Sequence, residues 1–487
     1  VGARTLTGIS SSGDVVLNSS GGVTVSEAVA ASTLQITGPA TLAANITTSG
    51  AQTYSGAATL SANAELAGSG ITLAGVSLQS GSNAYELTIN NSDAGSRIDG
   101  ILSGTGSLVK KGEGTLTLNG NNTYSGTTSV SAGTLKLGHA SALGVAASGR
   151  GTTVGANGSL DLNSLSVAEP VTLAGGRVLN GVLAGDMLLT ADSTMEAAAG
   201  SSLTLSGVIS GSYGLTVRGG GTITLSGNNS YTGNTTVSAG TLKVGHANAL
   251  GTAAGGTTVA AGATLDLLNV AVVAEALTLN GGTLKDATSS WGGNIQLGAN
   301  STFDIGAGDT LIVGGVVSGG YNLTKVGAGT LSLNGENTYS GGTTIGAGMV
   351  KLGHNAGLGT AAASIASGAA LDLNGKSIAN ALSVSGTGIG SGGAITNSDS
   401  SNEATLGGAI TLVADSSWVT AGAIKTTAKV DGAKALTVTG TGGLTLAAGV
   451  GQSTALTSVN ISVPLTLGAD ITTSGTQTYA GAVTLSG

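Results

Sequence analysis

Cysteine does not occur among the 487 residues, and several other residue types are scarce. Proline occurs three times, aromatic residues make up 2% of the chain and charged residues 8%. Without cysteine, a fold that works outside the cell has to be held together by packing and hydrogen bonds instead of disulfides. The net charge is −8, and lysine and arginine form no cluster. The sequence therefore predicts no nucleic-acid partner, because phosphate binding requires such a cluster.

Long hydrophobic runs are also missing. No stretch approaches ~18 uninterrupted apolar residues, so the sequence predicts no transmembrane helix. The chain starts at Val1 without an initiator methionine or a signal-peptide pattern, so we expect any signal peptide to have been removed or to lie outside this sequence. The outer membrane is expected as a partner only through segments that this sequence does not contain.

What the chain does contain is a large number of regularly placed apolar residues. Hydrophobic residues make up 40% of the sequence, glycine supplies 87 positions, and the mean hydropathy is +0.34. Disordered chains rich in glycine and serine are poor in apolar residues, so this chain is expected to fold. The regular spacing predicts many thin layers instead of one thick core.

Three stretches are near-copies of one another, at residues 112–144, 219–251 and 327–359. The first reads GEGTLTLNGNNTYSGTTSVSAGTLKLGHASALG. Equivalent tyrosines in the copies, Tyr124, Tyr231 and Tyr339, are 107 (231 − 124) and 108 (339 − 231) residues apart. Repetition at a fixed interval is typical of a solenoid, in which each repeat buries its apolar face only against its neighbours.

Short apolar runs inside the copies alternate with period two, which predicts half-buried strands. In the first copy and the run that follows it, the polar centres are Thr117, Lys136 and Asp161, separated by 19 (136 − 117) and 25 (161 − 136) residues. We therefore predict an all-β fold, a parallel β-solenoid with coils of about 20 residues, in which these three residues occupy successive coils of one face. The inward ladder is expected to consist of Leu116, Leu118, Leu135, Leu137, Leu160 and Leu162.

We expect residues 1–487 to form one continuous solenoid rod. Roughly 22 coils rising ~4.8 Å each would make it about 105 Å long. Along the rod we expect repeat-bearing blocks at about 106–212, 213–320 and 321–395, a divergent block at 396–465, and at 466–487 the start of a second copy of the unit begun at residue 41. This second start predicts either a slice of a much longer chain or a subunit whose open end docks on another copy.

The phrase that begins each copy, GxGTLTLxGxNTYSGxTTVxAGTLKLG, closely resembles the passenger-associated transport repeat, also called the autotransporter-associated β-strand repeat. The phrase ITTSGxQTYxGAxTL, at 46–60 and 471–485, is similar to repeats of very large filamentous-haemagglutinin-like bacterial surface proteins. The resemblance implies a right-handed parallel β-helix that a Gram-negative bacterium exports and displays outside the cell. It implies no enzyme activity.

Residues that commonly carry catalysis form no candidate catalytic site. The three histidines, His139, His246 and His354, occupy one repeat position, which favours a structural role in a turn over metal binding or pH sensing. The acidic residues are scattered, and the calcium-binding nonapeptide GGxGxD is missing. The sequence therefore predicts no enzyme, no cofactor and no metal ion. The repeated Tyr-x-Gly tyrosines are expected to close a thin core, with a sparse row for stacking carbohydrate as the alternative.

One segment, ITNSDSSNE at residues 395–403, is polar and acidic within a leucine-rich series. We predict that it forms an outward loop, and loops on a rigid scaffold are where binding usually resides. The alternative is a solvated bulge that binds nothing. The residues of this candidate binding loop are Asn397, Asp399, Asn402 and Glu403.

These patterns favour a structural extracellular rod of a bacterial surface or secreted protein, acting as an adhesin stalk or filament building block. Its main partner would be itself, through covalent continuation or end-to-end filament assembly. The alternative is a carbohydrate- or protein-binding adhesin module that acts through loops such as 395–403, with cell-surface glycans or neighbouring cells as partners. Either interpretation places the chain outside a Gram-negative bacterium or on its surface.

Overall fold

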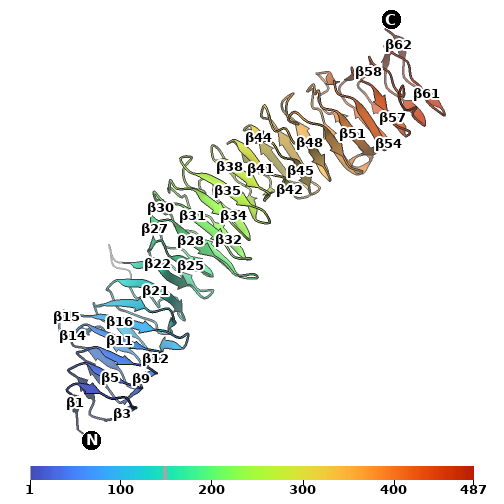
Figure 1. Ribbon diagram of the computed structural model, residues 1–487. Helices are drawn as coiled ribbons and strands as arrows, with labels where there is room; N and C mark the ends of the chain where they lie inside the picture. Colours follow the sequence, from blue (N-terminus) through green and yellow to red (C-terminus); the bar gives the residue numbers. More distant parts are fainter. Residues whose placement is uncertain (1, 146–150, 487) are drawn as a thin grey trace. The chain divides into compact units, whose positions relative to one another are not determined.

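The computed structural model describes residues 2–145 and 151–486. The chain forms two compact units. The first unit consists of Val1–Thr236 and Asn248–Gly255, and the second unit of Val237–Ala247 and Gly256–Gly487. Each is a stack of short strands joined by turns (Figure 1). In the described residues the helical structure is a single 3₁₀ turn, η1 (Ile389–Ser391), and no helix there is long and apolar enough to cross a membrane.

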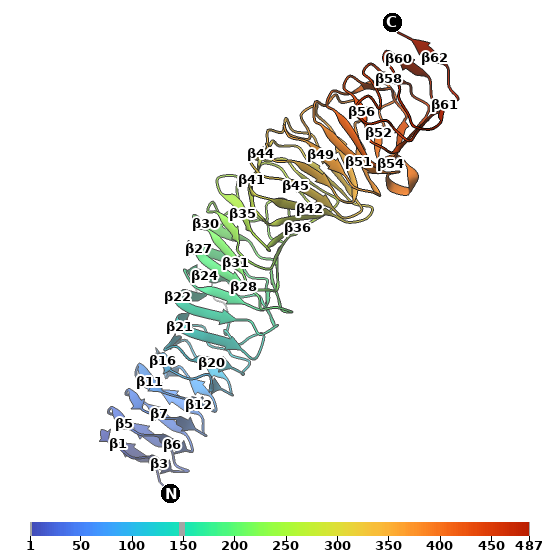
Figure 2. The same ribbon diagram turned by 45° about the vertical axis from the view of Figure 1, so that its right-hand side comes forward.

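Apart from the antiparallel pair β14 (Gln79–Ser80) and β15 (Asn83–Ala84), strands in the first unit pair in parallel, coil upon coil, in three columns. In Figures 1 and 2, β5, β11 and β16 follow one another along one column. That column contains β5 (Val29–Ala31), β8 (Ile46–Thr48), β11 (Ala64–Gly68), β16 (Glu86–Asn91) and β19 (Ser107–Lys111). The second contains β3 (Val15–Asn18), β6 (Leu34–Thr37), β9 (Gln52–Tyr54), β12 (Ile71–Leu73), β17 (Ser96–Ile98) and β20 (Thr115–Leu118). The third contains β1 (Arg4–Leu6), β4 (Val23–Val25), β7 (Ala40–Leu42), β10 (Ala58–Leu60), β13 (Val76–Ser77) and β18 (Leu102–Ser103).

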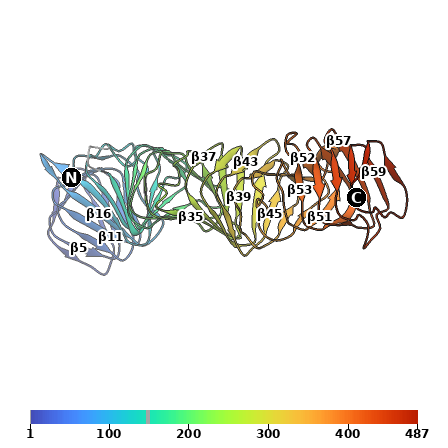
Figure 3. The ribbon, with the colours of Figure 1, turned by 90° about the horizontal axis from the view of Figure 1, so that it is seen from above.

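The second unit is built in the same way. Figure 3 shows β39, β45 and β51 in succession along one of its columns. This column contains β39 (Thr283–Ala287), β42 (Ser301–Ile305), β45 (Leu323–Val326), β47 (Thr343–Ile345), β49 (Ala363–Ile365) and β51 (Leu382–Gly386). Beside it run β40 (Ser289–Trp291), β43 (Thr310–Val313), β46 (Thr330–Leu333), β48 (Gly348–Leu352), β50 (Ala369–Asp372) and β52 (Ile395–Asn397). The predicted all-β parallel solenoid is confirmed; the single rod and its block boundaries stay predictions.

Leucines stack directly on leucines along β20 and β21 (Thr128–Leu137) of the first copy and β22 (Thr152–Asp161), which follows it. Leu116 pairs with Leu135 and Leu135 with Leu160, so these coils are 19 (135 − 116) and 25 (160 − 135) residues long. Leu118 pairs with Leu137 in the same register. The six ladder leucines have no exposed surface: Leu116, Leu118, Leu135, Leu137, Leu160 and Leu162.

Polar residues of the same strands form an outward column. Thr117 is the register partner of Lys136, and Lys136 that of Asp161, so the predicted order on successive coils is confirmed. In the second unit the column alternates in charge along β34 (Thr241–Val244), β36 (Thr264–Leu268), β39 and β42. Its register partners are Lys243, Asp266, Lys285 and Asp304. Opposite charges on neighbouring strands favour this register, because a slip along the strand would separate each charge from its opposite partner.

Replacing Leu137 with alanine is expected to cost about 2–5 kcal/mol of stability, because the truncation leaves a cavity in the core next to its register partner Leu118. Since coils of a solenoid are coupled mainly to their neighbours, amide hydrogen exchange should accelerate around β20, β21 and β22 and stay unchanged far away. Leu188→Ala is the control, because that side chain is 45% exposed and should tolerate truncation. Uniform loss of protection along the chain would contradict local coupling.

Candidate functional site

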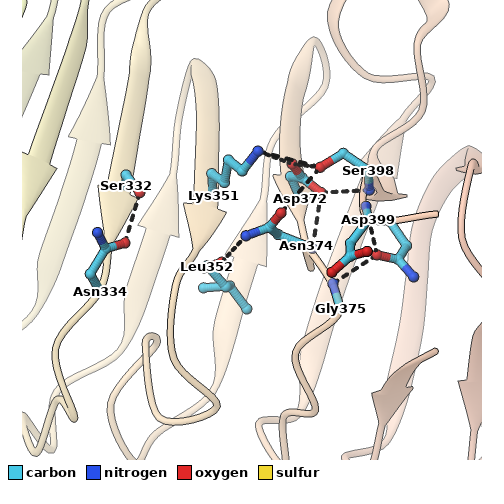
Figure 4. Close-up of polar contacts among 10 residues, drawn as sticks. Ser332, Asn334, Lys351, Leu352, Asp372, Asn374, Gly375, Ser398 and Asp399 are labelled. Carbon is cyan, nitrogen blue, oxygen red and sulfur yellow. Dashed lines mark hydrogen bonds and ion pairs between the residues drawn. The ribbon is translucent and has the colours of Figure 1, made fainter. Parts of the chain in front are cut away.

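The predicted loop at 395–403 begins as the largely buried strand β52 (Ile395–Asn397), so only the part from Ser398 onward lies outside a strand. This part rests on a buried carboxylate of the second unit (Figure 4). Asp372, at the end of β50, accepts hydrogen bonds from the backbone N–H groups of Asn374 and Ser398, both at 3.0 Å. The hydroxyl of Ser398 donates to Asp372 Oδ2 at 2.6 Å, and Lys351 Nζ lies 3.7 Å from the same oxygen. Asp372 is 2% exposed, so these contacts supply the hydrogen bonds that a buried carboxyl group needs. This carboxylate ties the base of the loop to the coil below.

Asn397 does not belong to the exposed part of the loop, contrary to our expectation. Its side chain has no exposed surface. Its Nδ2 donates to the carbonyls of Asn402 (2.9 Å) and Ala423 (2.8 Å), and its Oδ1 accepts from the N–H groups of Gly375 (2.8 Å) and Asp399 (3.3 Å). The assignment of Asn397 as a binding residue is therefore wrong, since the amide is needed to satisfy backbone groups on neighbouring coils.

The exposed tip of the loop is an acidic turn that bonds to itself. Asp399 Oδ1 accepts from the N–H of Ser401 at 2.9 Å, and its Oδ2 accepts from the amide of Asn402 at 2.7 Å. These bonds, the one from the Asn402 side chain foremost, lower the pKa of Asp399. Asn402 and Glu403 are exposed. Among residues 2–145 and 151–486, no group of three or more histidine, aspartate or glutamate side chains is placed to hold a metal ion.

Each repeat also contains a buried polar side chain that is hydrogen-bonded to neighbouring coils. In the first copy the buried amide of Asn122 accepts from the N–H of Leu102 (2.8 Å) and donates to the carbonyl of Ala142 (2.6 Å). These two partners lie on the coils below and above, so one side chain joins three coils. The other copies repeat both bonds through Asn229, with Ile209 and Ala249, and Asn337, with Val317 and Gly357.

The repeated tyrosines are internal as well. Each hydroxyl lies within hydrogen-bond distance of the threonine hydroxyl four residues later, at 2.5–2.6 Å, in the pairs Tyr124–Thr128, Tyr231–Thr235 and Tyr339–Thr343. None of the three tyrosines has exposed surface. Burial raises the pKa of Tyr124 and Tyr339, so both phenols stay neutral. These tyrosines therefore line the core and offer no exposed ring for stacking a sugar.

Two histidines act as turn acceptors, as the repeat position suggested. His139 Nδ1 accepts from the N–H of Ser141 at 3.0 Å. His354 Nδ1 accepts from the N–H of Ala356 at 3.1 Å. The imidazoles thus close the turn that follows the second ladder strand of their copies.

Two buried lysines were not anticipated from the sequence. Lys110 Nζ donates to the carbonyls of Lys111 (2.5 Å), Gly112 (2.7 Å) and Ala132 (3.2 Å), and Lys325 makes the three equivalent bonds in the third copy. Burial lowers the pKa of each lysine to about 8, although Glu113 and Asp304, respectively, partly oppose the shift. The sequence contains one indication of this burial. Leu108 faces inward, and period-two alternation places Lys110 on the same face.

Two glutamates at one repeat position are also buried in part or completely. Glu275 Oε1 accepts from the hydroxyl of Thr257 at 2.9 Å, and Glu169 Oε1 from that of Thr152 at 3.2 Å. Burial raises the pKa of each glutamate to about 7, and the threonine bond partly offsets the rise. The third copy has Asn380 here, whose neutral amide donates to two backbone carbonyls. The position therefore accommodates a neutral side chain.

The residues that join the coils lie in segments that match a known family of sequence repeats. Residues 108–137, 215–244 and 323–352 match the model of the passenger-associated-transport-repeat. The chain carries three passenger-associated transport repeats. Each matched segment contains the coil-joining asparagine and the buried tyrosine–threonine pair. The phrase that defines these repeats in sequence is thus the phrase that holds successive coils together.

The chain is also similar to a curated protein. Over 291 residues it is 34% identical to the Adhesin BmaC autotransporter of Brucella suis biovar 1 (strain 1330). The aligned part makes up 57% of this chain and 8% of that protein, so the chain spans a small part of its relative. No solved structure matches the chain. The predicted resemblance to autotransporter passenger repeats is confirmed.

Replacing Asn122 with alanine is expected to destabilise the chain by about 2–4 kcal/mol, because the backbone N–H of Leu102 and the carbonyl of Ala142 would lose their partner inside the core. Urea unfolding measures the loss. The adjacent Asn121, which is exposed, provides the matched control, and Asn121→Ala should change stability by less than about 0.5 kcal/mol. Equal effects of the two substitutions on stability would contradict the role of Asn122 in joining three coils.

Glu275 should make stability depend on pH. Its pKa is about 7 in the folded chain against an ordinary 4.5, so between these values the folded state binds the extra proton. The contribution of Glu275 to the free energy of unfolding is therefore fully present below pH 4.5 and is lost as pH rises through 7. We expect Glu275→Gln to stabilise the chain at pH 8 by about 1–2 kcal/mol and to have little effect at pH 4.5.

The pH experiment compares unfolding midpoints of wild type and Glu275→Gln across this range. Glu403→Gln is the control, because that glutamate is exposed on the polar loop. A midpoint difference that stays constant from pH 4.5 to pH 8 would contradict the titration of Glu275.

Proposed function

We propose that this chain is part of the extracellular passenger of a Gram-negative surface adhesin, in which the stacked repeats act as a stalk. The observation that carries the proposal is the use of the repeated polar residues. Asn122, Asn229 and Asn337 each bond to the coils below and above, so the recurring chemistry serves to extend the stack. Similarity to a protein named as an adhesin autotransporter supports the location outside the cell.

A stalk of this type gains length one coil at a time. Because each coil contacts mainly its neighbours, further coils extend the surface without a larger core. Leu116, Leu135 and Leu160 illustrate the principle, since each presents the same side chain to the next coil. The same open-ended stacking makes the chain's own continuation, or another copy, the partner that we propose for its ends.

Recognition through the loop at 395–403 is the alternative function. Its support is the exposed tip that Asp399, Asn402 and Glu403 form on an ordered base. The side chains of Asp399 and Asn402 are hydrogen-bonded to each other. Among the candidate residues of the described loop, this leaves the side chain of Glu403 as the one most available to a partner. We therefore favour the stalk.

The stalk proposal predicts surface display. An antibody raised against the purified chain should label intact, unpermeabilised cells of the bacterium that encodes it, and external protease should remove the signal. Deletion of the segment should reduce attachment of the cells, whereas a periplasmic marker should remain protected throughout. Labelling that requires permeabilisation of the outer membrane would overturn the proposed location.

A further inference from the structure

One insertion interrupts the regular coils of the first unit. Strands β14 (Gln79–Ser80) and β15 (Asn83–Ala84) form an antiparallel hairpin beside β16 (Figure 1). Gln79 anchors this hairpin, because its Oε1 accepts from the backbone N–H (3.1 Å) and the hydroxyl (3.3 Å) of Thr105 on the next coil. The hairpin is therefore held against the solenoid and forms a fixed wall.

A groove of about 420 Å³ opens beside the hairpin. Its lining includes a column of polar residues from four successive coils: Asn63, Glu86, Ser107 and Thr127. Each of these residues directly precedes one of the register partners Ala64, Leu87, Leu108 and Thr128. With strands ~4.8 Å apart, the column of polar residues is about 14 Å long. This length suits an extended ligand of a few small rings.

Hydrogen bonds along the column fix these side chains. Asn63 Oδ1 accepts from the N–H of Glu86 at 2.9 Å, and Ser107 Oγ accepts from both the N–H and the hydroxyl of Thr127 at 3.1 Å. Glu86 Oε1 accepts from Thr88 at 3.4 Å. Within the described part of the chain, these bonds leave three groups for a ligand. They are the side-chain NH2 group of Asn63, Glu86 Oε2 and the hydroxyl hydrogen of Ser107.

The remaining lining defines the chemistry of the ligand. Tyr85 is half-buried and lines the groove together with Glu86. Among the residues that the structure describes, no lysine or arginine lines the groove, which disfavours a phosphorylated or sulfated ligand. A single carboxylate is too few ligands for a calcium ion. An aromatic face beside neutral donors and one acceptor suits a ring with an apolar face and a hydroxylated rim.

We infer that this groove binds an uncharged saccharide, with Tyr85 against the face of a sugar ring and Asn63, Glu86 and Ser107 bonded to its hydroxyl groups. The inference deepens the proposed adhesin function and rests on it for its biological meaning. It assigns recognition to the first unit, whereas the loop at 395–403 belongs to the second unit.

The test uses the full chain and an array of neutral oligosaccharides, followed by calorimetric titration of the ligands that bind. Tyr85→Ala should weaken binding by about tenfold or more, and Glu86→Gln by about threefold or more. Tyr213→Ala is the matched control, because Tyr213 is a 44% exposed tyrosine of the same unit outside the groove. This variant should bind within about twofold of wild type. Circular dichroism and thermal unfolding establish that each variant is folded.

Three results would overturn the groove as a saccharide site. One is an array on which folded wild-type chain binds no neutral oligosaccharide at millimolar concentration. The second is unchanged affinity in both Tyr85→Ala and Glu86→Gln, and the third is binding confined to charged glycans. None of these three results would change the outcome of antibody labelling of intact cells, which tests the proposed location separately. Conversely, saccharide binding by the purified chain, together with a failure to label intact cells, would overturn the proposed location and leave the groove standing.

Discussion

The parallel contact between one coil and the next is the constraint on which the whole structure depends. A strand such as β20 has no partner within its own coil, so its backbone N–H and C=O groups are satisfied only by β17 and β21. The same contact brings Leu116 under Leu135 and Leu118 under Leu137. Backbone pairing and apolar burial are therefore satisfied together, and both fail together if the register slips.

Buried polar residues make this register specific. An all-leucine stack would tolerate displacement, whereas the amide of Asn122 has to meet one N–H below and one carbonyl above. Lys110 likewise places its ammonium among three carbonyls. Since an unsatisfied buried polar group is costly, a misplaced coil would lose several of these bonds at once. A chain with little charge thereby obtains specificity from a few internal polar residues.

Exposed polar features arise where the structure departs from this regularity. The repeated tyrosines and asparagines are committed to the interior, so they are not free to recognise a partner. The hairpin of β14 and β15 breaks the coil pattern and creates a groove, and the loop at 395–403 places an acidic tip on the surface. Irregular insertions on a regular scaffold are the places where polar side chains remain exposed.

Periodicity in the sequence was sufficient to predict the parallel solenoid, the coil length and the inward positions of the ladder leucines. Those features depend on local alternation and on repetition, which are visible in one dimension. Residues that break the alternation were harder to place. Asn397 was expected in an exposed loop and is buried, because its amide satisfies backbone groups of Gly375 and Ala423, more than twenty residues away on either side. The groove at Tyr85 was not predicted at all, since Asn63, Glu86 and Ser107 become neighbours only when coils of unequal length are stacked. The sequence by itself determined the architecture, because each coil repeats the same pattern. Tertiary structure decided which polar side chains stay available to a ligand, because that depends on the coils above and below.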